Sequence, residues 1–522
     1  MEVGLISLTE SRQVELLGLE RIATYLREQD VVVRFSQLLT DLQSTVNCET
    51  IMKLQTKIFQ DIPKSTKILG FTMHFPNAEI IFKLANALKK ARSDIIIFVG
   101  SQFATSCYKF ILNDCPDIDY VILGDGEQPV NSLIKAIYEQ RSTEDIPGVV
   151  CKNNIDEAHI KPKIDLTHFN FIDRDMLKNG HNLWRPHILS SEGCVGRCTF
   201  CQEGKWKGRN VEEVVNEIIQ FYEQFGNRNY FFVDSSFDGA GNAGKERIRK
   251  FCNYILAYPI RFSFECHLRA DTFFDEDEDL IKLMRKAGFT QVFIGIESGN
   301  QRDLTLYGKI AKVDDNYRTL RLFRKCDINV ISGFIMFHPF SDIYTIRENY
   351  YFLKENAESQ FLNYLKKLYI YYDSELYHYY NKKDVLKKYN YLKPEIYDFQ
   401  DSYIQYIHQK AIPVLAKSKI PQYAIKCHQV SNTYFTFKAL FPDEIQRYTE
   451  IHFKIKNSVA TIAEEYFYNI FVDYNIDKAI KEIDLLERNL KKIYDEAQNF
   501  RFRILSQKPF NTTFTKNMIE EI

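Results

Sequence analysis

Short apolar runs alternate with longer amphipathic stretches over the first 150 residues of this 522-residue chain. Helices are predicted at 13–28 and 78–90, where apolar residues recur every three or four positions. The runs between them are predicted strands: residues 3–8, 31–35, 67–72, 94–99 and 120–123. Alternation of this kind is typical of a parallel sheet flanked by helices. We therefore predict an α/β, Rossmann-like doubly wound domain over residues 1–150, with ligands binding beyond the carboxyl ends of its strands.

The alternation resumes between residues 186 and 345. Strands are predicted at 187–190, 230–233, 261–266, 291–296 and 330–336, with helices such as 211–225 and 277–287 between them. A series of β/α units can close partly into a barrel, with its chemistry at the carboxyl ends of the strands. We predict a central partial (β/α) barrel over residues 186–345, joined to the first domain by a linker of mixed polarity at 151–185.

Residues 346–522 are rich in Tyr, Phe, Lys and Asn and carry no further strong motif. We predict a mostly helical, aromatic-rich C-terminal domain here. Apolar residues at helical spacing predict one amphipathic helix of about five turns from Ile476 to Ile493. A packing role for the aromatic residues is favoured over a substrate channel, because aromatic side chains dominate ordinary buried contacts.

The composition is that of an ordinary globular protein, with 45% hydrophobic and 26% charged residues and a net charge of −1. This balance gives no indication of nucleic acid or an anionic membrane as partner. The N-terminus lacks a basic segment followed by an apolar run, and no stretch approaches the roughly 18 apolar residues of a membrane span. Eleven cysteines, an odd number, indicate reduced thiols rather than a disulfide framework. We expect a cytoplasmic protein.

Three of the cysteines fall within one short segment, residues 194–201, CVGRCTFC. The spacing Cys-x3-Cys-x2-Cys lets one loop present three thiolates to an iron–sulfur cubane and leaves one iron open to another ligand. Structural zinc is the competing interpretation, but zinc usually takes four ligands in two pairs, and no second pair follows in the sequence. We predict that Cys194, Cys198 and Cys201 bind a 4Fe-4S cluster.

With Phe200 just before the last cysteine and a predicted strand ahead of it, this loop resembles the signature loop of the radical S-adenosylmethionine (radical SAM) superfamily. The resemblance implies that S-adenosylmethionine (SAM) chelates the open iron and is cleaved by an electron from the cluster to a 5′-deoxyadenosyl radical. It makes Phe200 a candidate cofactor-binding residue. It also implies a reductant such as flavodoxin or ferredoxin as partner.

Residues 1–150 resemble the cobalamin-binding-type domain found ahead of many radical SAM enzymes, with the best match in GDGEQPVNSLIKAI, which begins at Gly124. Family members with an axial histidine carry it in an Asp-x-His-x-x-Gly motif early in the domain. The first histidine of this chain is His74, and the motif is absent. Two interpretations stay open: cobalamin bound without a protein histidine below the cobalt, or a domain that keeps the fold and has lost the cofactor.

Three further residues are candidates for SAM binding by the same resemblance. Asp234, in YFFVDSSFD, resembles the position that contacts the methionine end of SAM. Arg269, in FECHLRAD, suits the SAM carboxylate because a guanidinium is planar and always charged; the alternative is an ion pair with Asp271. Glu297, in FIGIESGN, resembles a strand-end acid that approaches ribose hydroxyls, as acids do in Rossmann domains.

A deoxyadenosyl radical beside a cobalamin-type domain is compatible with three reactions: methyl transfer, epimerisation at a peptide α-carbon, and rearrangement or dehydration of a small molecule. Epimerisation needs a hydrogen donor, and Cys427, beside His428, is the candidate catalytic thiol; the alternative is an ordinary buried cysteine. The aromatic C-terminal region favours a peptide or natural-product substrate. An iron–sulfur electron carrier or redox-sensing binding protein is the function from a different class, disfavoured by the extra Rossmann-like domain and the strand-end acids.

Overall fold

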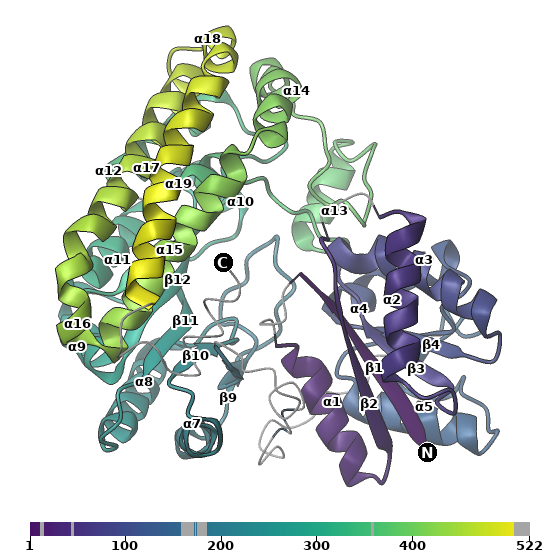
Figure 1. Ribbon diagram of the computed structural model, residues 1–522. Helices are drawn as coiled ribbons and strands as arrows, with labels where there is room; N and C mark the ends of the chain where they lie inside the picture. The colour runs from purple at the N-terminus through teal and green to yellow at the C-terminus, as the bar shows by residue number, and fades with distance from the viewer. Residues whose placement is uncertain are drawn as a thin grey trace. The chain divides into compact units, whose positions relative to one another are not determined.

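The computed structural model describes residues 1–10, 15–42, 46–157, 172, 174, 185–356 and 360–505. Strands and helices alternate along the chain up to β13, and the described residues after it are mostly helical (Figure 1). The chain forms two compact units. Unit 1 consists of Met1–Leu183 with Asn390–Pro394, and unit 2 of Trp184–Tyr389 with Glu395–Ile522. Most of the predicted linker at 151–185 lies outside the described residues.

Unit 1 contains a six-stranded sheet with the order β2-β1-β3-β4-β5-β6. Its strands are β1 (Glu2–Thr9), β2 (Val32–Leu39), β3 (Ile68–Thr72), β4 (Ile96–Gly100), β5 (Tyr120–Ile122) and β6 (Val149–Val150). All neighbours are parallel except β6, which runs antiparallel to β5. The strand order reverses at β1, so β1 and β3 flank the kind of crevice where open α/β sheets bind ligands.

Helices cover both faces of this sheet: α1 (Leu17–Glu28), α2 (Cys48–Asp61), α3 (Phe75–Ala91), α4 (Gln102–Asp114) and α5 (Glu127–Tyr138). Val3 and Leu5 of β1 share one buried cluster with residues of α1 and α5. The sequence interpretation missed α2, α4 and α5. The first two carried readable start signals, because Asn47 accepts the Thr50 N–H at 2.8 Å and Ser101 accepts the Ala104 N–H at 3.0 Å as N-caps.

A short segment from far along the chain belongs to unit 1, Asn390–Pro394. The Tyr391 ring stacks on Phe110 of α4 with ring centroids 4.9 Å apart, and its hydroxyl donates to Asp114 at 2.7 Å. The ring contacts bury a large apolar side chain and the hydroxyl keeps a partner, as buried tyrosines usually do. Unit 1 is therefore built from two separate stretches of the sequence.

Unit 2 contains a five-stranded parallel sheet with the order β13-β12-β11-β10-β7, the open (β/α) barrel predicted from the sequence. Its strands are β7 (His187–Ile188), β10 (Asn229–Phe232), β11 (Ser263–Arg269), β12 (Phe289–Glu297) and β13 (Asn329–Phe334), and a separate ribbon pairs β8 (Ser191–Glu192) with β9 (Lys207–Gly208). The connecting helices are α7 (Val211–Phe225), α8 (Gly241–Leu256), α9 (Glu278–Ala287), α10 (Gln301–Leu306) and α11 (Val313–Lys325). Phe232, Phe251 and Phe264 are buried together between the sheet and α8.

The chain after β13 is mostly helical, as predicted. Its elements are α12 (Ile343–Glu355), the 3-10 turn η3 (Phe361–Leu365), α13 (Glu375–Lys382), α14 (Ser402–Lys417), α15 (Ile420–Leu440), α16 (Pro442–Ile445), α17 (Thr449–Phe471), α18 (Ile476–Lys481) and α19 (Ile483–Leu505). The long helices α15, α17 and α19 pack against one another (Figure 1). In the described part of the chain, no helix is both long enough and apolar enough to span a membrane.

The single amphipathic helix predicted from Ile476 to Ile493 is wrong, because α18 ends at Lys481 and α19 begins at Ile483. Glu482 lies at the break, and its carboxylate accepts a hydrogen bond from the Asn469 side chain of α17 at 3.2 Å. The apolar spacing continues across the break, so the pattern gave no signal of it. A tertiary contact overrides the local periodicity here.

Candidate active site

The face of the barrel sheet turned away from the outer helices presents its side chains in rows, because alternate residues of a strand share a face and neighbouring strands are in register. From the amino to the carboxyl ends the rows are Glu265, Gln291 and Asn329; His267, Phe293 and Ile331; Arg269, Gly295 and Gly333. The first row is a chain of hydrogen bonds, with 2.8 Å from Asn329 to Gln291 and 2.7 Å from Gln291 to Glu265. The last row, at the carboxyl ends, contains one long side chain and two glycines.

This last row meets the loop that carries the three cysteines. A Cβ atom on Gly196 would lie 3.4 Å from Cys194 Sγ, 3.8 Å from Cys198 Sγ and 3.7 Å from Arg269 Cδ. Two of the three thiols and the strand-end arginine therefore surround one glycine. The structure brings together residues that the sequence interpretation had assigned to one site.

The Arg269 guanidinium is held in place by several groups. Its Nη1 donates to the Gly239 carbonyl at 2.8 Å and lies 3.4 Å from the Asp238 carboxylate, and its Nε lies 3.2 Å from Asp271. Burial raises the pKa of Asp238, and the charge of Arg269 opposes that rise. The ion pair with Asp271 is thus present, yet no hydrogen bond of Nη2 is found among the described residues. One donor group of the fork is left for a ligand.

The start of the cysteine loop is closed by backbone contacts. Gly193 has φ +71°, and a Cβ there would lie 2.3 Å from the Lys205 carbonyl oxygen, so only glycine fits. The Cys194 N–H donates to the Gly204 carbonyl at 2.9 Å. The two-stranded ribbon of β8 and β9 continues this pairing. Local hydrogen bonds therefore fix where Cys194 stands.

The end of the loop rests on the C-terminus of α10. The Thr199 N–H donates to the Tyr307 carbonyl at 2.9 Å, and its hydroxyl donates to the Leu306 carbonyl at 2.8 Å. The Thr199 carbonyl in turn accepts the Leu376 N–H of α13 at 2.8 Å. Phe200 packs edge-on against the Tyr307 ring at 5.6 Å. Phe200 therefore supports the loop, and its contact with a cofactor stays a prediction.

The thiols fit a cluster better than a single metal ion. Cys194 and Cys198 are half-buried and Cys201 is exposed. The Gly196 N–H donates to Cys194 Sγ at 3.3 Å, a contact of the kind that tunes iron–sulfur sites. In the described part of the chain, no three His, Cys, Asp or Glu side chains converge as ligands of one metal ion. A cubane does not require such convergence, because each thiolate binds a different iron.

Burial raises the pKa of Cys198 to about 11. The ammonium of Lys309 acts in the opposite direction on Cys198, whereas Glu297 adds to the rise. Both charged groups therefore lie near this thiol. Because a cluster ligand must be a thiolate, the nearby cation favours the form that binds iron.

Glu297 ends β12 with a left-handed backbone, φ +62°, where the register with β13 shifts. For a residue other than glycine this conformation costs of order 1–3 kcal/mol, and such residues gather at functional sites. Its Oε1 would lie 2.8 Å from a Cβ on Gly295, so the carboxylate folds over that glycine. Lys309 Nζ lies 3.8 Å from Oε1 and donates to the Gly295 carbonyl at 2.9 Å.

Lys309 is the site residue that the sequence interpretation missed. It follows Gly308, whose φ of +63° turns the chain after α10 back toward the thiols. A Cβ on Gly308 would lie 3.1 Å from the Arg197 carbonyl oxygen inside the cysteine loop. The only available signal was a Gly-Lys pair directly after a short helix, which is too common to indicate a site on its own.

Asp234 is fully buried at the end of β10. Its carboxylate accepts the Ser190 N–H at 2.7 Å, the Ser191 hydroxyl at 2.8 Å and the Ser190 hydroxyl. Burial raises its pKa, and these hydrogen bonds oppose the rise. Asp234 thus fastens the connection from β7 to β8 that leads into the cysteine loop. Its predicted contact with the methionine end of SAM stays a prediction.

A buried histidine links three elements beneath the loop. His338 Nε2 lies 3.2 Å from Asp303 Oδ1 of α10, and Nδ1 lies 3.0 Å from the Tyr380 hydroxyl of α13. The Tyr307 ring packs against the same imidazole at 5.8 Å. The two helices that carry the loop contacts are therefore joined through one side chain.

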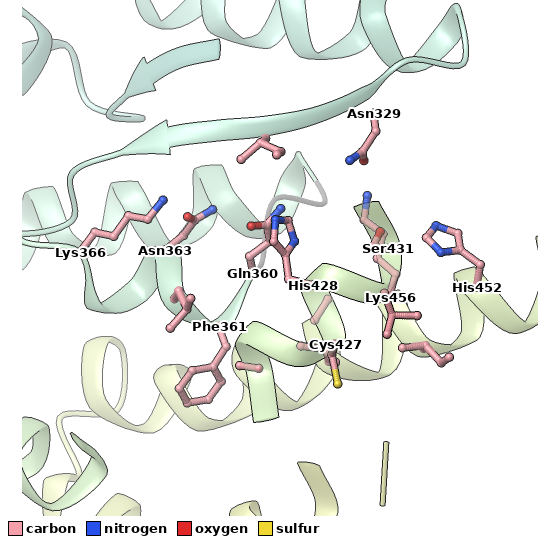
Figure 2. Close-up of a pocket in the computed structure, with 17 residues that line it drawn as sticks. Asn329, Gln360, Phe361, Asn363, Lys366, Cys427, His428, Ser431, His452 and Lys456 are labelled. Atoms are coloured by element: carbon pink, nitrogen blue, oxygen red, sulfur yellow. The ribbon is translucent and has the colours of Figure 1, made fainter. Parts of the chain in front are cut away.

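Cys427 lies elsewhere in unit 2. It is 4% exposed in α15, in a buried cluster with Val430 and Tyr434, and burial raises its pKa to about 12. It borders a cavity that begins at Asn329, the amino end of β13, with its sulfur turned away from the His428 ring (Figure 2). Asn329 and Phe334 stand at opposite ends of a strand about 17 Å long. The interpretation as an ordinary buried cysteine is favoured, and the predicted role as hydrogen donor gains no support.

Comparison with known proteins adds the family. The family model of the radical SAM superfamily matches residues 188–348, which carry the cysteine loop and the barrel sheet. An uncharacterized methyltransferase of Pyrococcus horikoshii is 25% identical over 342 residues, covering 62% of this chain and 69% of that protein. The anaerobic magnesium-protoporphyrin IX monomethyl ester cyclase of Synechocystis sp. is 25% identical over 260 residues, covering 48% of this chain and about half, 51%, of that enzyme.

Two solved structures share the fold. The structure of the cobalamin-dependent SAM radical enzyme OxsB, with aqua-cobalamin and SAM bound, matches 100% of this chain and 83% of its own with a TM-score of 0.68 at 17% identity. The radical SAM methyltransferase TsrM from Kitasatospora setae, with tryptophan and a SAM analog bound, matches 68% of this chain and 71% of its own with a TM-score of 0.55 at 17% identity. The predicted Rossmann-like domain, partial barrel and helical C-terminal region are confirmed.

The fold and the loop define an α/β enzyme with its site at the carboxyl ends of a partial barrel. Residues 188–348 are a radical SAM domain. Its cofactors are a 4Fe-4S cluster and SAM.

Arg269→Lys is expected to weaken SAM binding about tenfold while iron content stays unchanged. Lysine keeps the charge but loses the planar fork, and a charge-assisted contact to a carboxylate is among the stronger hydrogen bonds. Equilibrium dialysis of labelled SAM against the reconstituted protein measures the change. Arg285→Lys, at an ion pair 3.1 Å from Asp327 outside the site, is the matched control. Equal affinities in both variants would remove Arg269 from the SAM site.

Proposed function

We propose that this enzyme uses SAM and cobalamin to transfer a methyl group to an unactivated carbon of a natural-product or peptide substrate. The SAM part of the proposal rests on one observation: Cys194, Cys198 and Arg269 lie around Gly196. It places a strand-end cation beside two predicted cluster ligands. The cobalamin part rests on the fold of unit 1 and on the relatives.

In this proposal each residue has a defined task. Cys194, Cys198 and Cys201 hold the cluster, which, when bound, supplies the electron that cleaves SAM to methionine and the 5′-deoxyadenosyl radical. Arg269 binds the SAM carboxylate through Nη2, and the Glu297 carboxylate accepts ribose hydroxyls. The next row toward the amino ends of the strands includes His267 and Phe293, whose ring centroids lie 5.0 Å apart. These rings keep water from the site, as reactive radicals require.

Unit 1 offers the residues for a cobalamin site at the carboxyl ends of β1 and β3, where the strand order reverses. Asn77 spans this crevice, because its Nδ2 donates to the Thr72 carbonyl at 3.2 Å and to the Leu8 carbonyl at 3.5 Å. His74 is exposed directly after β3, and its N–H donates to Asn77 Oδ1 at 2.8 Å. His74 carries the one imidazole among the described residues of unit 1, and an imidazole can bind a cobalt ion.

Methyl transfer leads among the three reactions because of the relatives. They include the Pyrococcus methyltransferase, a hopanoid C-3 methylase of Methylococcus capsulatus and a cytidylyl-2-hydroxyethylphosphonate methyltransferase of Streptomyces wedmorensis. The cyclases and a 4′-phospho-dehydrooxetanocin synthase of Priestia megaterium are the counterexamples that keep rearrangement as the second candidate. Epimerisation falls behind, because its candidate thiol Cys427 lies at the other end of the barrel strands. A flavodoxin or ferredoxin is the proposed electron donor.

The experiment that tests the cobalamin part is retention of hydroxocobalamin. The reconstituted protein is mixed with an excess, desalted, and its visible spectrum read. About one cobalamin per chain is expected, together with S-adenosylhomocysteine beside 5′-deoxyadenosine under reducing turnover, because methyl transfer consumes a second SAM. No retained cobalamin would overturn methyl transfer and leave rearrangement by hydrogen abstraction.

His74→Ala, with Lys83→Ala as an exposed control within α3, extends this test. If the imidazole binds cobalt, the variant retains cobalamin with a changed visible spectrum. If cobalamin sits without a protein histidine below it, the spectrum is unchanged. The two spectra separate the two modes of binding without any assay of substrate turnover.

A further inference from the structure

A cavity of about 160 Å³ lies in unit 2 at the amino end of β13. Asn329 and Ile331 of this strand border it, and its other walls come from η3, α15 and α17. The far, carboxyl end of β13 pairs with Glu297 near the thiols. The cavity is therefore a concave site separate from the candidate SAM site.

The size and the walls of this cavity suit a small apolar molecule. Most of its surface is apolar. The apolar side chains that contribute to it include Ile331, Phe361, Leu362, Val430, Ile455 and Val459. An apolar cavity of roughly 150 Å³ in another protein stays dry and binds benzene. A molecule with one six-membered ring therefore matches this volume, and the burial of its apolar surface favours binding.

One buried polar atom borders the cavity without a partner. His452 of α17 is 2% exposed, and its Nε2 has no hydrogen-bond partner among the described residues. The ring stacks on Tyr434 with centroids 4.0 Å apart, which fixes its orientation. Figure 2 shows the His452 ring directed toward the cavity. A buried polar atom without a partner is unfavourable, so a ligand group that bonds to Nε2 is stabilised here.

The cavity favours a neutral ligand. Burial lowers the pKa of His452 to about 3 and that of His428, the second imidazole of the lining, to about 4, so both rings are uncharged near pH 7. The two lysines of the lining, Lys366 and Lys456, have interactions within the chain, and Lys366 Nζ donates to the Ser332 carbonyl at 3.4 Å. Neither lysine therefore requires an anion as its partner.

A hydroxyl is the neutral group that suits the imidazole in both of its tautomers. Nε2 of a neutral histidine donates in one tautomer and accepts in the other, whereas a hydroxyl can do both. Ile455 lies three residues after His452 on α17, and Val459 lies one further turn along the same face. A single small ligand can therefore contact the imidazole and an apolar wall of the same helix.

We propose that this cavity binds a neutral molecule of one small ring and one hydroxyl, with the hydroxyl hydrogen-bonded to His452 Nε2 and the ring against Ile455 and Val459. Small-molecule sites commonly combine apolar walls with a few placed polar groups that fix the orientation of the ligand. The site is distinct from the SAM site of the proposed function. Its occupation can be measured without cluster, SAM or cobalamin.

Calorimetric titration of the full-length protein with phenol and toluene tests the proposal. The two probes have nearly the same shape and differ in the hydroxyl. Phenol is expected to bind at one per chain. His452→Phe keeps an aromatic ring beside Tyr434 and removes Nε2. This variant is expected to lower the ratio of phenol affinity to toluene affinity about tenfold, the effect of one neutral hydrogen bond, while toluene affinity does not fall.

Tyr434→Phe is the matched control. It removes a buried hydroxyl that lies 2.7 Å from the Thr449 hydroxyl, and Tyr434 is not part of the cavity lining. The ratio of the two affinities should stay as in the unchanged protein. Val459→Phe fills the cavity while it keeps His452, so it is expected to weaken both probes at least tenfold. Thermal melting shows that each variant is folded before its titration is interpreted.

Four results would overturn the proposal. They are no phenol binding by the unchanged protein, an unchanged affinity ratio in a folded His452→Phe variant, undiminished phenol binding in a folded Val459→Phe variant, and tighter binding of benzoate than of phenol. The last result would show that the site prefers an anion. Since the titrations use no SAM, failure here leaves the proposed function untouched, and failure of the SAM experiments leaves this site untouched.

Discussion

Replacing Cys194, Cys198 and Cys201 together by alanine is expected to abolish iron incorporation and all formation of 5′-deoxyadenosine. The unchanged protein, reconstituted without oxygen, should contain about four irons and four sulfides per chain and absorb broadly near ~400 nm. The three thiolates are the proposed protein ligands of this cluster, so the triple variant has no protein ligand for its irons. Iron analysis, the visible spectrum and chromatography of the products measure the three effects.

Cys48→Ala is the matched control, because Cys48 is an exposed thiol in α2 of unit 1. This variant should keep iron, colour and SAM cleavage. Iron retained by the triple variant, or tetrahedral zinc with no iron uptake in the unchanged protein, would contradict the cluster assignment. Single substitutions test the thiols one at a time. Cys194→Ala removes the thiol that accepts the Gly196 N–H at 3.3 Å. Cys201→Ala removes the exposed thiol.

The strands were largely predictable because their residues are buried on both faces, which leaves a continuous apolar run. The predicted strand at 291–296 became Phe289–Glu297, and that at 67–72 became Ile68–Thr72. Helix α2 was missed although it has an apolar face, since only Ile51, Leu54 and Ile58 of its 14 residues are buried. A sparse apolar stripe gives little periodic signal. The segment Asn390–Pro394 was unpredictable for another reason, because its place in unit 1 depends on a contact with α4 that is remote in sequence.

The candidate site, like the fold, has one part that the sequence predicted and one part that it did not. The cysteine spacing is local, so the sequence alone identified the loop. The closure of Arg269 on Gly196 depends on the register of β11 with its neighbours, which no local pattern encodes. The turn at Gly308 brings Lys309 to the site. Cys427 lies outside the site, because α15 packs at the amino ends of the strands. Motifs revealed the ligands of the cofactor, whereas the side chains around them had to come from tertiary structure.

Glu297→Gln is expected to weaken SAM binding by roughly 10- to 100-fold without loss of iron. A hydrogen bond to a charged group contributes about 1.5–3 kcal/mol, and the amide keeps the shape while it loses the charge. Glu297→Gly separates binding from stability, because glycine relieves the left-handed backbone at φ +62°. This variant should lose SAM affinity to a similar extent while its melting temperature does not fall.

Lys309→Met completes the experiment. Its ammonium lies 3.8 Å from the Glu297 carboxylate and donates to the Gly295 carbonyl, so it positions the acid rather than replacing it. If so, the double variant Glu297→Gln/Lys309→Met binds SAM no more weakly than Glu297→Gln alone, because coupled residues are not additive. Lys312→Met, an exposed lysine three residues on, is the control and should bind SAM normally. Strictly additive losses would show that Lys309 contacts SAM by itself, and unchanged affinity in Glu297→Gln would remove the strand-end acid from the site.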